Sequence, residues 1–460
     1  MTYDAAILQK VVLLHCKNNN AMIKKNFSKA LQRVVRTYFQ GQFETSFSGL
    51  MSLESEIVSY EQSRSFRRIL SIFYLGQLLD LPSLNAILLA HGIRSTTAQV
   101  RFNDLCKSLT NNKIRLIFES IFSQILQERF AELCAKSDST WSRMDITAVL
   151  DDSIFRQWLS DTADFGDYFK SWFSGQVGKT VHGFKVLTFG LTIDGVFYPL
   201  FLEFVKKEAQ NPAQNILTAI KTVEKWGEFV AQLRKKGIDL PKIPLSCDSG
   251  YSDKRLEQAC QTHQLTYISV PKKTHILRFD NREIKIAKFI EDEFLPAEAE
   301  HNLAQKDKKN ADKTPFTLRI RSFYKALDKE VTLLFFRLNN SKKVSVIYCT
   351  DKNITAKSLR RHWFERTQIE QFFRLLKHTL KIQEAKTKTK NEFECKLFRF
   401  AFIALHAQLF TRYVRKKIKL CRRFGFEQIR RCIIFQITKI DILDKEINDL
   451  LHQKYTINHL

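Results

Sequence analysis

Three acidic residues, far apart along the chain, stand where they could bind a divalent cation. Asp151 and Asp248 each follow a short β-prone run, at 145–150 and 243–247. In open α/β sheets, active sites gather at the carboxyl ends of strands, so the two carboxylates are expected to face each other there. A divalent cation prefers oxygen ligands and would remove their mutual repulsion. Either aspartate alone is more typical of a helix cap or a turn, but the pair favours a metal site.

A helix-forming stretch that covers at least 362–380 supplies the third carboxylate. Trp363, Arg366, Glu370 and Lys377 have the spacing W-x2-R-x3-E-x6-K, and at about 100° per residue they fall within an arc of about 60°. The adjacent apolar stripe, which is expected to pack on a sheet, is Ile369, Phe373, Leu376 and Leu380. We expect Glu370 to reach a metal, with Arg366 and Lys377 placed to contact phosphates. An amphipathic helix with ordinary charged flanks is the alternative interpretation.

The surrounding sequence predicts a mixed α/β sheet that holds these residues. Its expected strands are 145–150, 181–192, 196–205, 243–247 and 265–270, and its expected helices are 213–235 and 252–261. Asp194 and Gly195 form a strong hairpin signal, and Pro199 indicates a strand at the sheet edge. Asn211 and Ser252 are the expected N-caps of the two helices.

The remaining segments divide the chain into three predicted domains. Residues 1–138 are expected to form a helical DNA-binding domain, in which 81–109 fit either a helix-turn-helix or an ordinary three-helix core. Residues 139–390 form the catalytic domain, with a β-rich insertion at about 271–350. The insertion holds strands at 317–324, 331–337 and 344–350, and residues 391–460 are expected to be helical.

The charge of the chain indicates a polyanionic partner. Lys and Arg number 74 against 48 Asp and Glu, which gives a net charge of +26. A chain this basic usually binds nucleic acid, although a lysine-rich genome would produce the same bias. Basic and aromatic residues that suit contact with a nucleic acid are interleaved near the C-terminus, at Phe398, Arg399, Phe400, Phe410, Arg412, Tyr413, Arg415, Lys416 and Lys417.

Cysteine usage and hydropathy indicate the compartment. The nine cysteines are scattered without a C-x2-C pair, which argues against a zinc site and for a reducing environment. No apolar run reaches the length of about 18 residues that a membrane helix needs. We therefore expect a cytoplasmic protein that does not enter a membrane.

The motifs around the acidic residues resemble those of a known family. Residues 362–377, with the sequence HWFERTQIEQFFRLLK, resemble the Y-x2-R-x3-E-x6-K signature of the DDE transposases of bacterial insertion-sequence family four. Leu150-Asp151-Asp152-Ser153 and Cys247-Asp248-Ser249-Gly250-Tyr251 resemble its first and second aspartate motifs. The likeness covers residues 140 to 410 or so. Trp363 stands where the signature has tyrosine, and Thr367 stands where an aromatic residue often follows the arginine.

The resemblance implies an RNase H-like catalytic core that uses two Mg²⁺ or Mn²⁺ ions. Its catalytic and metal-binding triad corresponds to Asp151, Asp248 and Glu370, with Asp152 as a competing first ligand. Arg366 and Lys377 then contact phosphates near the cleaved end, and Trp363 keeps a stacking surface without a hydroxyl group.

The resemblance also implies a function and partners. The function is cut-and-paste movement of DNA, which makes double-stranded DNA with terminal inverted repeats and target DNA the partners. A homodimer on DNA, in the nucleoid of a bacterial cytoplasm, is expected. Lys179, His182 and Lys185 precede the hairpin and are further candidates for DNA contact.

Two other functions are compatible with the same core. One is an RNase H-like, structure-specific DNA nuclease without strand transfer. The insertion and the long helical flanks favour the transposase over it. The other is a catalytically inactive DNA-binding protein descended from a transposase, which the changes at Trp363 and Thr367 leave open. The intact acidic triad argues against this third possibility.

Overall fold

The residues that carry the predicted chemistry lie in one compact unit of the chain. A computed structural model describes residues 111–136, 146–156, 166–174, 178–206, 214–306, 316–338, 343–383, 389–418, 421–423 and 425–430, and isolated positions between 30 and 74 and at 341 and 387. The chain divides into a unit at 126–401 and a second unit formed by the remainder. The possible helix-turn-helix at 81–109 and the expected cap Asn211 lie outside the described residues.

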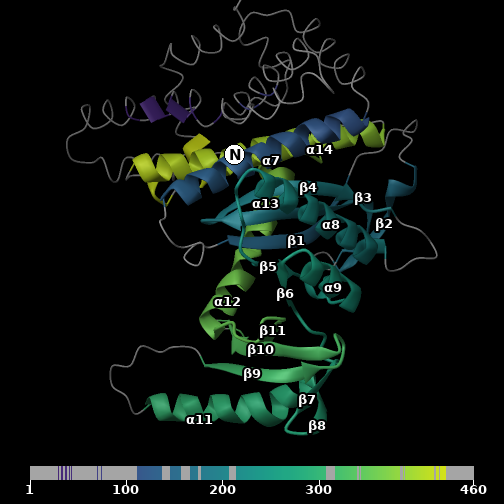
Figure 1. Cartoon of the computed structure of the whole chain (residues 1–460), viewed down its shortest axis with the longest axis vertical. Coiled ribbons are helices and arrows are strands. Elements are labelled where there is room, and N and C mark those ends of the chain that lie inside the picture. The colour runs from purple at the N-terminus through teal and green to yellow at the C-terminus, as the bar shows by residue number, and fades with distance from the viewer. Residues whose placement is uncertain are drawn as a thin grey trace, which may run out of the picture. The chain divides into compact units, whose positions relative to one another are not determined.

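An eleven-stranded mixed sheet is the framework of unit 126–401 (Figure 1). Its order is β2-β3-β1-β5-β6-β11-β10-β9-β7-β8, with β4 paired to β3. The first six strands are β1 (Ile146–Phe155), β2 (Phe169–Ser174), β3 (Lys179–Ile193), β4 (Val196–Phe204), β5 (Ile243–Cys247) and β6 (Leu265–Ser269). β5 is parallel to both β1 and β6, whereas the other described pairs are antiparallel. The predicted mixed α/β sheet is thus confirmed.

The β3–β4 hairpin has the predicted turn. Asp194 and Gly195 have φ values of 52° and 73°, the left-handed conformation that a two-residue type I′ turn requires at both positions. Pro199 lies opposite Gly190, and β3 is the described partner of β4, which confirms the predicted edge position. The pairing shifts between Phe189 and Gly190, so the hairpin carries a bulge beside β1.

Gly190 is required sterically at this bulge. A Cβ atom there would lie 2.2 Å from the backbone oxygen of Tyr198 and 2.6 Å from the Phe197 ring. We expect Gly190→Ala to lower the free energy of unfolding by about 1–3 kcal/mol, because the crowded backbone cannot move away freely. Urea unfolding measures the change. Gly250→Ala is the control, since a Cβ at Gly250 meets nothing within 4 Å; equal stability of the two variants would contradict the prediction.

Two helices follow the hairpin and pack on the sheet. α8 (Gln214–Lys235) lies where a helix was predicted and buries Trp226, whose ring centroid is 5.6 Å from that of Phe189. α9 (Lys254–Thr262) begins one residue later than predicted, because Asp253 and not Ser252 is its N-cap. The Asp253 carboxylate accepts the Arg255 N–H at 2.9 Å, while the Ser252 hydroxyl is engaged with the Tyr348 hydroxyl at 2.8 Å.

The described part of the insertion at 271–350 has five strands rather than the three predicted, and it is not separate from the central sheet. Its strands are β7 (Ile276–Phe279), β8 (Arg282–Lys285), β9 (Thr317–Tyr324), β10 (Lys329–Arg337) and β11 (Val344–Cys349). β11 pairs with β6, so the insertion continues the central sheet. A helical run was missed: α10 (Ile286–Phe289), the π-helical η5 (Ile290–Phe294) and α11 (Leu295–Lys306) (Figure 1). This run packs on β10: the ring centroids of Phe289 and Phe294 lie 4.9 and 6.1 Å from that of Phe335.

The predicted helix over 362–380 is interrupted at Arg366. α12 (Ala356–Glu365) ends there, α13 (Thr367–Arg374) follows, and η6 (Leu375–Thr379) is a π-helical turn. Threonine hydroxyl groups bond the carbonyls at the break: Thr367 Oγ1 donates to Phe364 O at 2.7 Å, and Thr192 Oγ1 donates to Glu365 O at 3.4 Å. Such side-chain bonds compete with regular helix bonding, and the interruption follows from them.

The remaining long helices are α7 (Asn111–Lys136) and α14 (Lys390–Lys417). No helix in the described part of the chain is both long and apolar enough to cross a membrane.

Candidate active site

Strand β1 carries Asp151 and Asp152 within its length. The predicted strand end at Leu150 is wrong, because Asp152 through Phe155 continue to pair with β3. Successive side chains of a strand point to opposite faces, so the two carboxylates belong to different faces of the sheet. Leu150 pairs with Cys247 of parallel strand β5. Asp248 follows Cys247, so it stands at the level of Asp151 on the neighbouring strand.

One face of β1 is covered by α12, α13 and η6. Three contacts attach these helices to residues of this face: Thr147 Oγ1 to His362 Nδ1 at 2.7 Å, Arg366 Nη1 to Asp151 Oδ2 at 3.0 Å, and Lys377 Nζ to Ser153 Oγ at 2.6 Å. All three β1 residues are odd-numbered, as the alternation of a strand requires for a shared face. The structure therefore brings the helix signature to the face of the sheet that carries Asp151.

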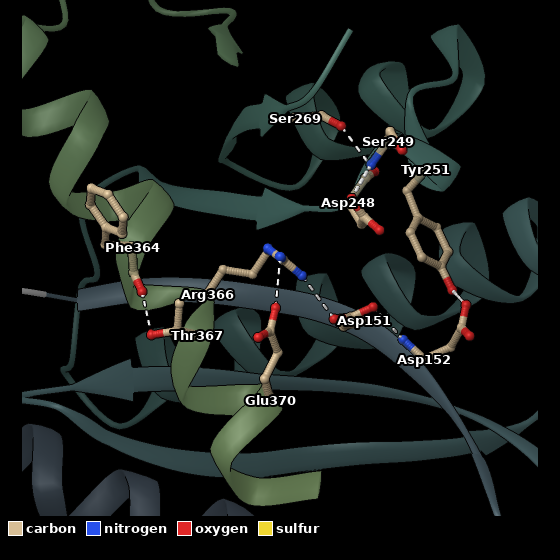
Figure 2. Close-up of polar contacts among 10 residues, drawn as sticks. All are labelled: Asp151, Asp152, Asp248, Ser249, Tyr251, Ser269, Phe364, Arg366, Thr367 and Glu370. Carbon is tan, nitrogen blue, oxygen red and sulfur yellow. Dashed lines mark hydrogen bonds and ion pairs between the residues drawn. The ribbon is translucent and has the colours of Figure 1, made fainter. Parts of the chain in front are cut away.

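The guanidinium group of Arg366 joins two of the three predicted carboxylates (Figure 2). Nη1 lies 3.0 Å from Asp151 Oδ2, and Nη2 lies 2.7 Å from Glu370 Oε1. Its plane also lies over the Trp363 ring, 4.9 Å from the centroid. The side chains of Arg366 and Asp151 are each 16% exposed, whereas that of Glu370 is 47% exposed. Of these three side chains, Arg366, Asp151 and Glu370, the last is the most accessible.

Asp248 faces this ion-pair cluster from the end of β5 (Figure 2). Its Oδ1 accepts the Ser249 N–H at 2.7 Å, and its backbone carbonyl accepts the Ser269 hydroxyl at 3.1 Å. These bonds fix the residue at the sheet edge, and the Asp248 side chain remains exposed. Asp151, Asp248 and Glu370 therefore approach one another from two strands and a helix.

Burial and charge both act on the carboxyl group of Asp151. Burial raises the pKa of Asp151 to about 7; the Arg366 charge opposes this rise, and the charges of Asp152 and Asp248 add to it. Among the described residues, no three His, Cys, Asp or Glu side chains are grouped as a set of metal ligands. In this trio the Arg366 guanidinium lies between Asp151 and Glu370.

Metal binding at this cluster is expected to depend on pH. The pKa of Asp151 is raised from 3.8 to about 7, so the carboxyl group keeps its proton up to neutral pH and must release it to accept a cation. We expect Mn²⁺ affinity to rise about tenfold per pH unit below about pH 7 and to level off above it. Calorimetric titration between about pH 5.5 and 8.5 measures this dependence. A flat profile would contradict it, and Asp151→Asn should abolish the dependence together with most of the binding.

Asp152 lies on the opposite face from the helix signature. Its Oδ2 accepts a hydrogen bond from the Tyr251 hydroxyl and lies 3.3 Å from Lys185 Nζ. Lys185 also lies 5.3 Å from the Trp172 ring centroid, and its side chain is only 14% exposed. Since Asp151 rather than Asp152 shares a face with Glu370, the geometry favours Asp151 as its partner.

The other basic candidates are placed in different ways. Lys179 and His182 are exposed on the part of β3 beyond the end of β1. His182 and Lys185 point to opposite faces of β3 by alternation, so they cannot both face the same surface. In the interleaved C-terminal series, Phe398, Phe400 and Phe410 are buried, whereas Arg412 and the basic residues at 415–417 are exposed. The three phenylalanines of this series are therefore core residues of α14, whereas Tyr413 is half-buried.

Supporting residues of the site were missed in the sequence. Tyr251 follows Asp248 by three residues, and Ser153 and His362 lie inside the motifs already singled out. Their contacts join segments that are far apart along the chain. Spacing from the acidic residues was the available signal, and it did not indicate which partners they would meet.

A comparison with protein families identifies the kind of domain that holds Asp248 and Glu370. Residues 220–405 match a family model described as "Transposase DDE domain". This chain carries a transposase DDE domain. The match includes Asp248, Glu370 and the whole of α12 to η6. Asp151 precedes the matched residues, so its inclusion rests on the geometry above. No curated protein matches the chain.

The domain sets the chemistry at a coarse level. A transposase DDE domain implies transposase activity, which is phosphoryl transfer on DNA. Such domains generally use a divalent metal ion and bind DNA. The mixed sheet with its parallel strands β1, β5 and β6 is consistent with the core that such a domain needs.

Proposed function

We propose that this transposase cuts DNA at the two ends of a mobile element and joins the freed 3′ ends to target DNA. One observation carries the proposal: Asp151 and Asp248 on neighbouring strands face Glu370 on α13, with Arg366 between Asp151 and Glu370. The catalytic domain is RNase H-like and spans 139–390. The helix signature supports a place in insertion-sequence family four, with Trp363 replacing the tyrosine.

Asp151, Asp248 and Glu370 are the residues that would hold two Mg²⁺ or Mn²⁺ ions. When bound, such ions activate the attacking water or 3′-hydroxyl group and stabilise the leaving oxygen. The chain contributes the geometry: β1 and β5 hold the two aspartates on neighbouring strands, and Arg366 joins Glu370 of α13 to Asp151. Hydrolysis and joining then need no covalent intermediate on a serine, cysteine or tyrosine side chain.

Arg366 and Lys377 are suited to hold the phosphates on either side of the bond that is cut. Arg366 already presents both Nη atoms to carboxylate oxygens, and the same planar fork fits phosphate oxygens. Burial lowers the pKa of Lys377 to about 8, with Arg156 adding to the effect. A phosphate beside Lys377 would favour its charged form again, so the site gains from an anionic ligand. Trp363 supports Arg366 by stacking against it.

The exposed part of β3 is proposed to contact DNA away from the reacting phosphate. Thr188 pairs with Asp151, and His182 lies six positions further along β3. At about 3.3 Å per residue this is roughly 20 Å, which corresponds to about six base pairs of a duplex. Lys179 and His182 on this ribbon are the candidates for such contacts. A homodimer on paired ends is the assembly that the resemblance to family four suggests.

A joining reaction tests the proposed function. The substrates are a duplex with the terminal inverted repeat and a pre-cleaved 3′-hydroxyl end, and a supercoiled plasmid as target. With Mg²⁺, a transposase joins the end to the plasmid. A structure-specific nuclease would cut without joining, and an inactive DNA-binding protein would retard the duplex in a gel but cut nothing with Mg²⁺ or Mn²⁺. Either of these two outcomes would overturn the proposal.

A further inference from the structure

We propose that Tyr251 and Asp152 are positioning residues that fix the spacing of Asp151 and Asp248. Their contact joins the turn after Asp248 to the strand that carries Asp151 (Figure 2). The inference rests on the proposed function of the two aspartates, and it gives Asp152 a role other than that of a ligand.

Asp248 and Tyr251 belong to one short turn. η4 (Ser249–Tyr251) follows Asp248 directly, and the Tyr251 N–H donates to the Asp248 carbonyl at 3.0 Å. The Asp248 carboxylate caps the turn by accepting the Ser249 N–H at 2.7 Å. A displacement of Tyr251 would therefore displace Asp248 as well.

Two side chains of β6 bind this turn through hydrogen bonds. Ser269 Oγ donates to the Asp248 carbonyl at 3.1 Å, and the Tyr267 hydroxyl donates to the Tyr251 carbonyl. Both donors lie on β6, on the side of β5 away from β1. These bonds stabilise the turn, but they do not set its distance from Asp151.

The Tyr251 side chain bridges this turn to β1. The last backbone pair between β1 and β5 joins Leu150 to Cys247, so beyond it the two catalytic aspartates have no shared ladder. The Tyr251 hydroxyl crosses this gap to Asp152 Oδ2, and the Asp152 N–H donates to Asp151 Oδ1 at 2.9 Å. A continuous series of hydrogen bonds thus runs from Asp248 through Tyr251 and Asp152 to Asp151.

The hydrogen bond between Tyr251 and Asp152 is buried on the Tyr251 side and has a carboxylate as its acceptor. Tyr251 is 3% exposed, and burial raises its pKa well above the ordinary value, with the Asp152 charge adding to the rise. The phenol therefore remains a hydrogen-bond donor at neutral pH. Lys185 supports the acceptor from 3.3 Å and is itself packed over Trp172, which assigns Lys185 to this network rather than to DNA.

A fixed spacing matters because the described ladder between β1 and β5 ends at the Leu150–Cys247 pair, just before the two aspartates. Without the bridge, the turn could relax away from β1 and separate the two carboxylates. Residues that orient metal ligands in this way typically change metal affinity by about 10-fold to 100-fold when they are replaced.

The test is Mn²⁺ binding by the full-length protein, measured by calorimetry. Tyr251→Phe and Asp152→Ala should each weaken Mn²⁺ affinity about tenfold, whereas Asp152→Asn keeps an acceptor oxygen and should stay within about threefold of wild type. Tyr38→Phe is the matched control, because it removes another buried phenol hydroxyl, bonded to His406 within the second unit. It should leave Mn²⁺ affinity unchanged. Thermal unfolding of every variant shows whether it is folded.

Activity gives a second readout that a purely structural role would not change. In Tyr251→Phe, the Mg²⁺ concentration for half-maximal cleavage should rise about tenfold, while DNA affinity and the rate at saturating Mg²⁺ stay near wild type. The double variant Tyr251→Phe/Asp152→Ala should bind Mn²⁺ no more weakly than either single variant, because both remove the same bond.

Three results would overturn the inference. Wild-type Mn²⁺ affinity in Tyr251→Phe would remove the role of the bridge, even if the protein cleaves and joins DNA as proposed. A loss in Asp152→Asn as large as in Asp151→Asn would make Asp152 a ligand itself. A wild-type protein that binds no Mn²⁺ and cleaves no DNA would overturn the proposed function and, with it, the positioning role.

Discussion

Neutralising any one of Asp151, Asp248 and Glu370 is expected to reduce cleavage of the transposon end by at least about 1000-fold. A bound metal ion contributes several kcal/mol to the stabilisation of the transition state, and each 1.36 kcal/mol corresponds to about tenfold in rate. The matched changes are Asp151→Asn, Asp248→Asn and Glu370→Gln, which keep side-chain size and remove one charge. DNA affinity should not fall, because the phosphates are bound by basic residues. Single-turnover cleavage and gel retardation measure the two properties separately.

Asp351→Asn is the control for this series. Asp351 also follows a strand, but its Oδ1 accepts the Asn353 N–H at 2.8 Å and so serves its own turn. An asparagine keeps an acceptor for that bond, and the variant should cleave at the wild-type rate. Equal losses in Asp351→Asn and Asp248→Asn, or near wild-type cleavage by the three matched variants, would show that the acidic cluster is not the catalytic centre.

The places of Asp248 and Glu370 on their strand and helix could be predicted because each is tied to a local pattern. β5 is a short apolar run that ends where predicted, directly before Asp248. The spacing of Arg366 and Glu370 places both on one side of a helix, and this spacing survives the interruption at Arg366 because the break adds no residue to the helical path. Patterns of this kind depend on residues close together in sequence.

The course of β1 could not be predicted, because it depends on distant partners. Aspartate is unfavourable in strands, which made Leu150 the expected strand end. In the fold, Arg366 pairs with Asp151, and Lys185 and Tyr251 contact Asp152, so the strand continues through both. The opposite roles of the two aspartates follow from that continuation, since adjacent residues of a strand lie on different faces.

The sequence alone could not show which basic side chains are already paired within the protein. Lys185 was a candidate for DNA contact, but it is paired with Asp152 and mostly covered.

The helical run from α10 to α11 was missed because its packing partner is distant in sequence. Its apolar residues Phe289 and Phe294 pack against Phe335 of β10, a partner that is remote in sequence.

Replacing Arg366 by Met is expected to tighten Mn²⁺ binding to the DNA-free protein and to abolish efficient cleavage. In the wild type, a cation must compete with a guanidinium group that bridges Asp151 and Glu370 at 3.0 and 2.7 Å. Removing that competitor should raise Mn²⁺ affinity about tenfold, which corresponds to about 1.4 kcal/mol. Cleavage should fall at least about 100-fold, because the variant lacks the planar group proposed to hold phosphate in the transition state.

The stability of the Arg366→Met variant supplies an independent readout of the same competition. Without the guanidinium, the buried Asp151 carboxyl group keeps its proton and the half-exposed Glu370 loses an ion pair, so the free energy of unfolding should fall by only about 1 kcal/mol. Mn²⁺ should stabilise the variant more than the wild type, since a ligand stabilises the fold according to its affinity. Arg374→Met, at an exposed position on the same helix, should change neither property. Weaker Mn²⁺ binding in Arg366→Met would instead mean that Arg366 helps to assemble the carboxylates, because its removal would then let them separate.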